Sequence, residues 1–253
     1  MMGGHHAISG AAAWIAVTAT VPFTLGLEPL PTTSVVLGSL VTAGAALLPD
    51  VDHTSATIAQ SGGMFTKGIS SAAGAASGGH RHGMHSILAV AGFTAGTIFL
   101  GRWWAVLPNL GNVPVGSALM LLALVACANK ALKISPKGIA RLWVSAAVVV
   151  LAVLKYAPHE LTWLPTSVMV GVIVHLLGDM ITTGGVPLLW PWVPKPPNFL
   201  DDVPILSRIW KPNGNLALPV LGNAGSKREW VLCIGLSGYT VYGIAATTGV
   251  LTA

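Results

Sequence analysis

The stretch Leu47-Leu48-Pro49-Asp50-Val51-Asp52-His53 decides how this chain is to be interpreted. An apolar run ends at a proline, and two carboxylates and an imidazole follow within four residues. The chain of 253 residues has only 8 acidic residues and 8 histidines, so this clustering indicates a site. Further polar clusters occur at His5-His6, at residues 80–86 (His-Arg-His-Gly-Met-His-Ser) and at residues 175–179 (His-Leu-Leu-Gly-Asp).

The composition predicts an integral membrane protein. Hydrophobic residues make up 53% and charged residues 8% of the chain, with a mean hydropathy of +0.72. Soluble domains carry about 25% charged residues, so this chain cannot cover a water-facing surface. The net charge of +5 is expected in the loops between spans, and no nucleic acid is expected as a partner. Cys127 and Cys233 lie in apolar runs and suggest neither a disulfide framework nor a thiolate metal site.

The expected fold class is all-α: a polytopic transmembrane helix bundle of about seven spans, in a single domain over residues 1–253. A span needs about 20 mostly apolar residues. The expected spans are 7–27, 33–48, 86–100, 115–131, 139–156, 164–181 and 230–251. No basic segment precedes the first, which is therefore expected to be a retained span. Residues 54–79 are expected to be a flexible cytoplasmic loop, with a small interfacial helix at 57–65 as an option, and 187–228 a Pro- and Trp-rich surface loop.

The distribution of basic residues predicts the orientation. With seven spans, 11 of the 13 Lys and Arg lie on the side of the N-terminus, and only Arg102 and Lys155 lie on the other side. The positive-inside rule therefore predicts a cytoplasmic N-terminus. The same topology brings all four polar clusters to this face, although the histidines played no part in the charge count.

The residue types at these clusters favour metal chemistry. His175 and Asp179 are four residues apart on an expected helix, so they project from one face; the alternative is a hydrogen-bonded pair within the bundle. Asp50, Asp52 and His53 mix oxygen and nitrogen donors, which suits zinc, manganese or iron. Helix capping explains one of these aspartates, but hardly both beside a histidine. Two metals could activate water for phosphoester hydrolysis, and one could serve amide or ester hydrolysis.

The histidines at 80–86 are less easily assigned. Spacing does not show which of His80, His82 and His85 is a ligand, and Arg81 is expected to neutralise a phosphate or a neighbouring carboxylate. The sequence contains no serine nucleophile elbow, His-Glu-x-x-His motif, P-loop or dinucleotide fingerprint.

These motifs, in this order, resemble the YdjM-like family of bacterial and archaeal inner-membrane proteins, described as predicted metal-dependent hydrolases. The resemblance covers most of the chain. It rests on His6-Ala-Ile-Ser-Gly10, residues 48–53, His80-Arg81, His85-Ser86, residues 175–179, Thr182, residues 185–191 (Gly-Val-Pro-Leu-Leu-Trp-Pro) and, more weakly, Gly225-Ser226 with Glu229. His82 stands where the family often has glycine. The family is also distantly similar to zinc-dependent phospholipase C and single-strand nucleases, which implies zinc and phosphoester cleavage. Manganese and magnesium are the alternative metals.

The leading hypothesis is a hydrolase that cleaves a phospholipid or another lipid-linked ester or phosphoester at the cytoplasmic face of the inner membrane. Its expected metal ligands are His6, Asp50, Asp52, His53, His80, His85, His175 and Asp179. Asp50, Asp52, Arg81 and Asp179 are the expected catalytic residues. Asp50 or Asp52 should then lie within reach of a metal shared with His85, His175 or Asp179. The alternatives are a metal transporter and a non-catalytic envelope protein with a structural metal.

Overall fold

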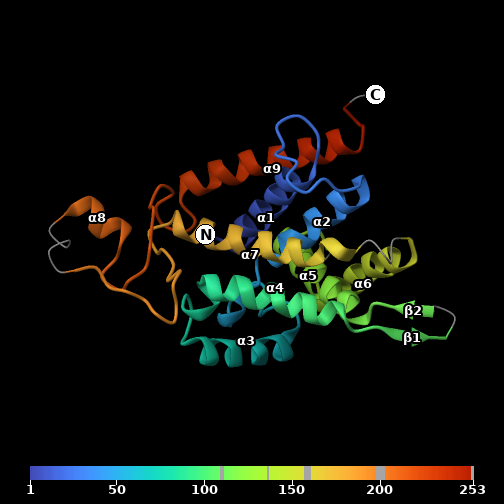
Figure 1. Cartoon of the computed structure of the whole chain (residues 1–253), viewed down its shortest axis with the longest axis horizontal. Coiled ribbons are helices and arrows are strands. Elements are labelled where there is room, and N and C mark those ends of the chain that lie inside the picture. Colours follow the sequence, from blue (N-terminus) through green and yellow to red (C-terminus); the bar gives the residue numbers. More distant parts are fainter. Residues whose placement is uncertain (109–110, 136, 157–160, 198–202, 252–253) are drawn as a thin grey trace.

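The computed structural model describes residues 1–108, 111–135, 137–156, 161–197 and 203–251. It is an all-α bundle, which confirms the expected fold class (Figure 1). The long helices are α1 (Gly3–Thr18), α2 (Thr32–Ala45), α3 (Gly63–Ser77), α4 (Ile87–Gly101), α5 (Val115–Ala131), α6 (Ile139–Tyr156), α7 (Leu164–Met180) and α9 (Lys227–Thr247). The shorter elements are α8 (Pro204–Ile209), the 3₁₀ helices η1 (Pro49–Asp52), η2 (Gly83–His85) and η3 (Leu161–Trp163), and strands β1 (Ala105–Leu107) and β2 (Gly111–Val113).

The core of the bundle lies where α2, α5 and α7 meet. It is filled by fully buried side chains such as Val41 on α2, Leu121 on α5 and Val172 on α7. Glycine allows these helices to approach closely: a Cβ at Gly44 would lie 2.0 Å from the Leu124 carbonyl oxygen. Packing through small residues is typical of helices in a membrane, where there is no hydrophobic drive between helices.

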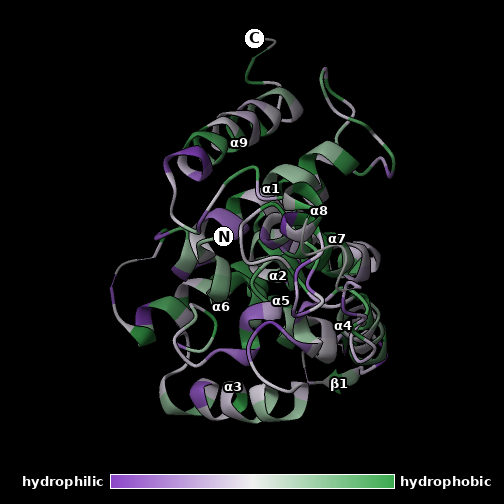
Figure 2. Ribbon diagram, turned by 90° about the vertical axis from the view of Figure 1, so that its left-hand side faces the viewer, coloured by the Kyte–Doolittle hydropathy of each residue, from purple (hydrophilic) through white to green (hydrophobic). Residues whose placement is uncertain are grey.

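Apolar side chains also cover much of the outer surface. On α6, Val144, Val148 and Leu151 are each more than 60% exposed, and on α9 Val231 and Ile234 are exposed to a similar degree. Figure 2 shows hydrophilic colour in short stretches only, such as the first turn of α9. A surface of this kind is stable against lipid rather than water, so the protein is a membrane protein.

The lengths of the helices refine the predicted spans. Among the described residues, four segments are long and apolar enough to cross a membrane: Thr32–Asp52, Ile139–Tyr156, Leu161–Met180 and Lys227–Thr247. Helices α4 and α5 are apolar but shorter, and α1 has 16 residues. Every predicted span thus contains a helix, whereas the number of complete crossings and the cytoplasmic N-terminus stay predictions.

The predicted end of the first span was wrong. Helix α1 ends at Thr18 rather than near residue 27. Pro22 interrupts the apolar run and Phe23 has a φ of 65°, so the chain folds back and the backbone N–H of Leu25 donates to the Ala16 carbonyl. Proline lacks the N–H that a continuing helix needs.

The expected loop at 54–79 also needs correction, because its second half is helix α3. The option of a helix at 57–65 was misplaced, since α3 begins only at Gly63. Alanine favours the helix, and small side chains let it pack closely on η1: a Cβ at Gly74 would lie 2.8 Å from the Asp52 carbonyl oxygen. Gly78, with a φ of 85°, then ends the helix in the left-handed conformation.

Two other regions complete the fold. The short antiparallel hairpin β1–β2 joins α4 to α5 and was not predicted. Between α7 and α9, the described residues form only α8 and isolated bridges such as Val186 with Leu216. Figure 1 shows α8 and the hairpin at opposite ends of the molecule. The region expected as a surface loop at 187–228 therefore contains, within its described residues, no long helix before α9 begins at Lys227.

Candidate metal centre

Histidines and aspartates from five segments converge at one end of the bundle. His6 comes from the first turns of α1, and His175 and Asp179 come from the last turns of α7. Asp50 and Asp52 lie on η1, His85 ends η2, and the intervening loop carries His80 and Arg81. Proline at position 49 begins the tight turn of η1 shortly after α2, which directs Asp50 toward His175 on α7 and Asp52 toward His80.

Four donor atoms form the centre of this cluster. Nε2 of His85 lies 3.2 Å from Nε2 of His175. Each of these two nitrogens lies 3.7 Å from Oδ1 of Asp50. Oδ2 of Asp179 is 3.7 Å from His85 Nε2 and 3.9 Å from His175 Nε2. The donors of a tetrahedral zinc ion, with metal–ligand distances near 2.0–2.1 Å, lie about 3.3 Å from one another, so this spacing is close to that of a metal site.

A backbone hydrogen bond fixes the tautomer of His175. Its Nδ1 lies 2.7 Å from the carbonyl oxygen of Ala46, at the end of α2. A carbonyl can only accept, so Nδ1 carries the proton, and in the neutral ring the lone pair of Nε2 points into the cluster. A ligand histidine commonly donates its second nitrogen in this way, which orients the ring.

Asp52 holds the other side of the site. Its Oδ1 lies 2.9 Å from Nδ1 of His80, and its Oδ2 accepts the backbone N–H of Arg81 at 3.2 Å. Oδ2 is also 3.4 Å from Nδ1 of His85, an ion-pair distance without hydrogen-bond alignment. Asp52 is thus placed to orient His85 and His80, while His85 presents Nε2 to Asp50 and His175.

The electrostatics of His85 follow from this arrangement. Burial lowers the pKa of the His85 imidazole, but the carboxylates of Asp50, Asp52 and Asp179 outweigh burial and raise the pKa to about 9. In the metal-free protein the ring is therefore an imidazolium at neutral pH. A metal that takes Nε2 has to displace this proton.

A second group of donors shares residues with the first. Nε2 of His6 lies 3.3 Å from Oδ1 of Asp179, and the His6 ring stacks on His175 with 3.7 Å between centroids. Asp179 consequently offers Oδ1 to His6, where the amino group of Met1 also contacts it, and Oδ2 to His85 and His175. Asp179 therefore belongs to both groups of donors.

The donor set fits a divalent metal. Three overlapping groups have one donor atom per residue within 4.8 Å of each other: His6 with His175 and Asp179, Asp50 with His85 and His175, and Asp52 with His80 and His85. Nδ1 of His6 and Nδ1 of His85 are buried without a hydrogen-bond partner. Buried polar atoms normally have partners, and the mixed nitrogen and oxygen donors of these groups could hold a metal ion.

Not every predicted residue joins these groups. His53 lies outside them; its Nδ1 bonds Ser55 Oγ at 2.8 Å, and its ring stands 4.4 Å from that of His80. His82 is exposed, and its Nδ1 donates to the carbonyl of His80. His80 reaches only the Asp52 edge and is itself 37% exposed.

Arg81 occupies the rim of the centre. Its Nη2 lies 3.2 Å from Oδ2 of Asp179, and the side chain is 27% exposed. Its φ of 58° turns the backbone so that the N–H faces Asp52 while the guanidinium reaches Asp179. A side chain at Gly184 would collide with this guanidinium, because a Cβ there would lie 1.8 Å from Nη1.

A supporting contact that the sequence did not predict joins His5 to Glu229. Nδ1 of His5 lies 2.5 Å from Oε1 of Glu229, which is fully buried and also accepts the backbone N–H groups of Met2 and Gly225. Ser226 caps α9 by accepting the N–H of Glu229. The Ser-x-x-Glu spacing before an apolar run is the signal of such a cap, although it does not reveal His5.

These features agree with a comparison to known families. The family model of the YdjM inner membrane protein matches residues 1–250. The chain belongs to this family. No curated protein and no solved structure matches the chain. The YdjM assignment supports location in the inner membrane, and it covers every segment that contributes to the centre.

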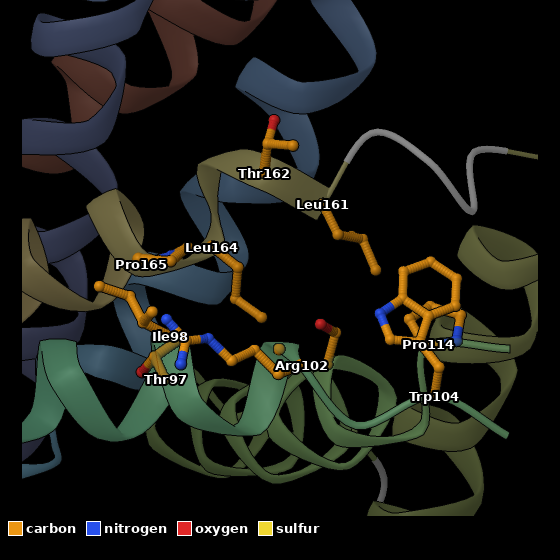
Figure 3. Close-up of a pocket in the computed structure, with 11 residues that line it drawn as sticks. Thr97, Ile98, Arg102, Trp104, Pro114, Leu161, Thr162, Leu164 and Pro165 are labelled. Carbon is orange, nitrogen blue, oxygen red and sulfur yellow. The ribbon is translucent and has the colours of Figure 1, made fainter.

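Another pocket of this YdjM protein lies well away from the centre. It has a volume of about 360 Å³ and is lined by residues that include Arg102, Trp104 and Leu164 (Figure 3). Leu164 begins α7, whereas Asp179 lies near its end. At 1.5 Å per residue the two are about 20 Å apart along the helix, so this pocket is no part of the metal centre.

Substitution of single donors should separate ligands from neighbours. We expect His175→Ala to lower zinc affinity by more than about 100-fold, and Asp52→Asn, which removes an orienting partner, to lower it by about 10–100-fold. His82→Ala is the matched control and should retain wild-type affinity. The zinc affinity of each variant is measured by competition with a chromophoric chelator, and its metal content by mass spectrometry. Equal losses in all three variants would contradict the assignment.

Metal affinity should also depend on pH through His85. Because its pKa is raised to about 9, the proton competes with the metal below that pH. Affinity should therefore increase as pH rises from about 6 to 9, with release of about one proton from this residue per metal bound near pH 7. Calorimetry in buffers of different ionisation enthalpy measures the release. An affinity that does not change over this range would contradict the proposed role of His85.

Proposed function

We propose that this protein is a membrane-bound, metal-dependent hydrolase that cleaves a phospholipid or another lipid-linked phosphoester. The observation that carries the proposal is the pairing of a metal-type donor set with a partly exposed arginine, Arg81, that contacts the same Asp179 carboxylate. A metal with a purely structural role would not require a partly exposed arginine beside its ligands, whereas a phosphoester substrate would.

The side chains of the centre can take the separate roles that phosphoester cleavage requires. His85, His175 and Asp179 would hold a divalent metal, which would supply Lewis-acid polarisation and make water more acidic, and three protein ligands leave a position for that water. Arg81 is placed to bind the phosphate oxygens through charge-assisted hydrogen bonds. Asp50, whose side chain is 19% exposed while Asp52 and Asp179 are buried, is the carboxylate best placed to accept the proton of the attacking water.

Asp52 acts through other residues. Its oxygens are occupied by His80, by the Arg81 N–H and by the approach of His85. It is therefore a positioning residue in this proposal, which changes the catalytic role expected for it from the sequence.

An apolar groove beside the centre favours a lipid substrate. It has a volume of about 460 Å³ and lies between α1, α7 and α9. Ala13 and Ala16 form one wall and Leu177 and Gly178 another. The groove ends against the centre, because a Cβ at Gly178 would lie 3.2 Å from Nδ1 of His6. An acyl chain in this groove would bring its head group to the donor cluster.

The distribution of charge argues against a metal transporter. Of the described carboxylates, only Glu28 lies away from this end of the bundle, in the loop after α1. Between the two ends, the described core of α2, α5 and α7 holds apolar side chains and a few hydroxyls, such as Thr42 bonded to Ser167, but no carboxylate or imidazole. A metal path would need polar ligands through the bilayer.

Arg81 provides the sharpest test of the hydrolase. The purified protein, loaded with zinc or manganese, should cleave phospholipid in detergent micelles. Arg81→Gln should lower kcat/KM about 10–100-fold, the effect of losing a charged hydrogen bond, at unchanged metal content. Arg102→Gln is the control and should have wild-type kinetics. A fully metallated protein without any phosphoester turnover would contradict the proposal.

The groove can be tested separately from the chemistry. Ala13→Leu narrows the groove, so we expect kcat/KM for a long-chain phospholipid to fall about tenfold, with turnover of a soluble aryl phosphodiester unchanged. Ala95→Leu places the same bulk on the exposed face of α4 and should alter neither rate. Equal loss on both substrates would mean that the groove holds no acyl chain.

A further inference from the structure

A second cavity, distinct from the metal centre and the groove, lies where α5 ends and α6 begins. Its volume is about 560 Å³, and Lys130, Lys133 and Lys137 all line it. Asn129 adds an amide, and Ile139 and Leu142 form an apolar wall. Three ammonium groups around one cavity require an explanation.

The charge of this cavity is not balanced by the described carboxylates. All ion pairs among the described residues involve a histidine, Arg81 or the amino group of Met1, and none involves a lysine. Lys130 donates to the carbonyl of Gln60, which leaves its charge in place. Lys133 and Lys137 are exposed. A cluster of lysines with an apolar wall attracts an anionic ligand.

The cavity lies at the membrane boundary, on the side of the metal centre. The end of α5 meets the start of α1, since a Cβ at Gly4 would lie 3.4 Å from the Ala131 carbonyl oxygen. Ile139, in the cavity wall, is also the first residue of the candidate span Ile139–Tyr156. The lysines therefore stand at the level of lipid head groups.

An apolar side chain is open to a lipid at the cavity itself. Ile139 is 52% exposed in the cavity wall and begins the candidate span, so an acyl chain attached to a head group in the cavity can pack against it. The exposed residues Val144, Val148 and Leu151 lie on the opposite face of α6, at about 3.6 residues per turn, and belong to the lipid-facing surface of the span rather than to the cavity. Free phosphate would make no use of Ile139, so this side chain favours a lipid as the occupant.

We propose that this cavity binds an anionic phospholipid, with the phosphate among Lys130, Lys133 and Lys137 and the start of an acyl chain against Ile139. Basic pockets between membrane helices on the cytoplasmic side commonly bind acidic head groups. This lipid is separate from any substrate of the metal centre, and the site stands whether or not the protein is a hydrolase.

The test uses the full chain in detergent, titrated with phosphatidylglycerol and followed by native mass spectrometry. The double variant Lys133→Gln/Lys137→Gln should bind this lipid at least about tenfold more weakly than wild type. Arg102→Gln/Lys155→Gln removes the same charge at the other predicted face and should bind as wild type. Lys130 is left intact because it also bonds Gln60.

Several outcomes would overturn the site: equal losses in both double variants, equal binding of phosphatidylcholine, or displacement of the lipid by inorganic phosphate at millimolar concentration. Lys133→Arg/Lys137→Arg should restore binding, because it restores the charge. Unchanged zinc content in each variant shows that the bundle has folded, so a loss of lipid then reports on the cavity itself.

Discussion

The hydrogen bond from His175 to the carbonyl of Ala46 is the interaction on which the centre depends. It joins α7 to the end of α2 at the point where the chain turns into η1. One bond thereby satisfies a carbonyl at a helix end, selects the tautomer of the imidazole and sets the distance to Asp50. Gly171, one turn earlier on α7, makes the approach possible, since a Cβ there would lie 2.8 Å from the Ala46 nitrogen.

Burial of so many ionisable groups needs compensation. Asp52, His85, His175 and Asp179 are all nearly inaccessible, and a buried charge is costly unless it is paired. The carboxylates and imidazoles here are arranged so that nearly every oxygen faces a nitrogen, which stabilises the cluster without a metal and preserves its geometry for one. The centre also lies at the ends of helices, where irregular backbone can supply donors such as the Arg81 N–H.

The convergence of the site could be predicted from the sequence because it needs only helix spacing and the number of spans. His175 and Asp179 share a face by their four-residue separation, and topology brings Asp50 and His85 to the same end. The roles within the site could not be predicted. Asp50 and Asp52 are two residues apart with the same chemistry, and only the turn of η1 directs one to the central donors and the other to His80. Helix α3 was missed because its Gly- and Ser-rich composition is typical of a loop, whereas close packing on η1 stabilises it.

Glu229 joins the last helix of the bundle to the first. It lies in the first turn of α9, which Ser226 caps, and reaches across to His5, the residue beside the donor His6. More than 220 positions separate these partners along the chain, so ribosomal synthesis delivers one long before the other. The contact that orients His5 can therefore form only after α9 has been synthesised, whereas His6 meets its partners His175 and Asp179 on α7, which is made earlier.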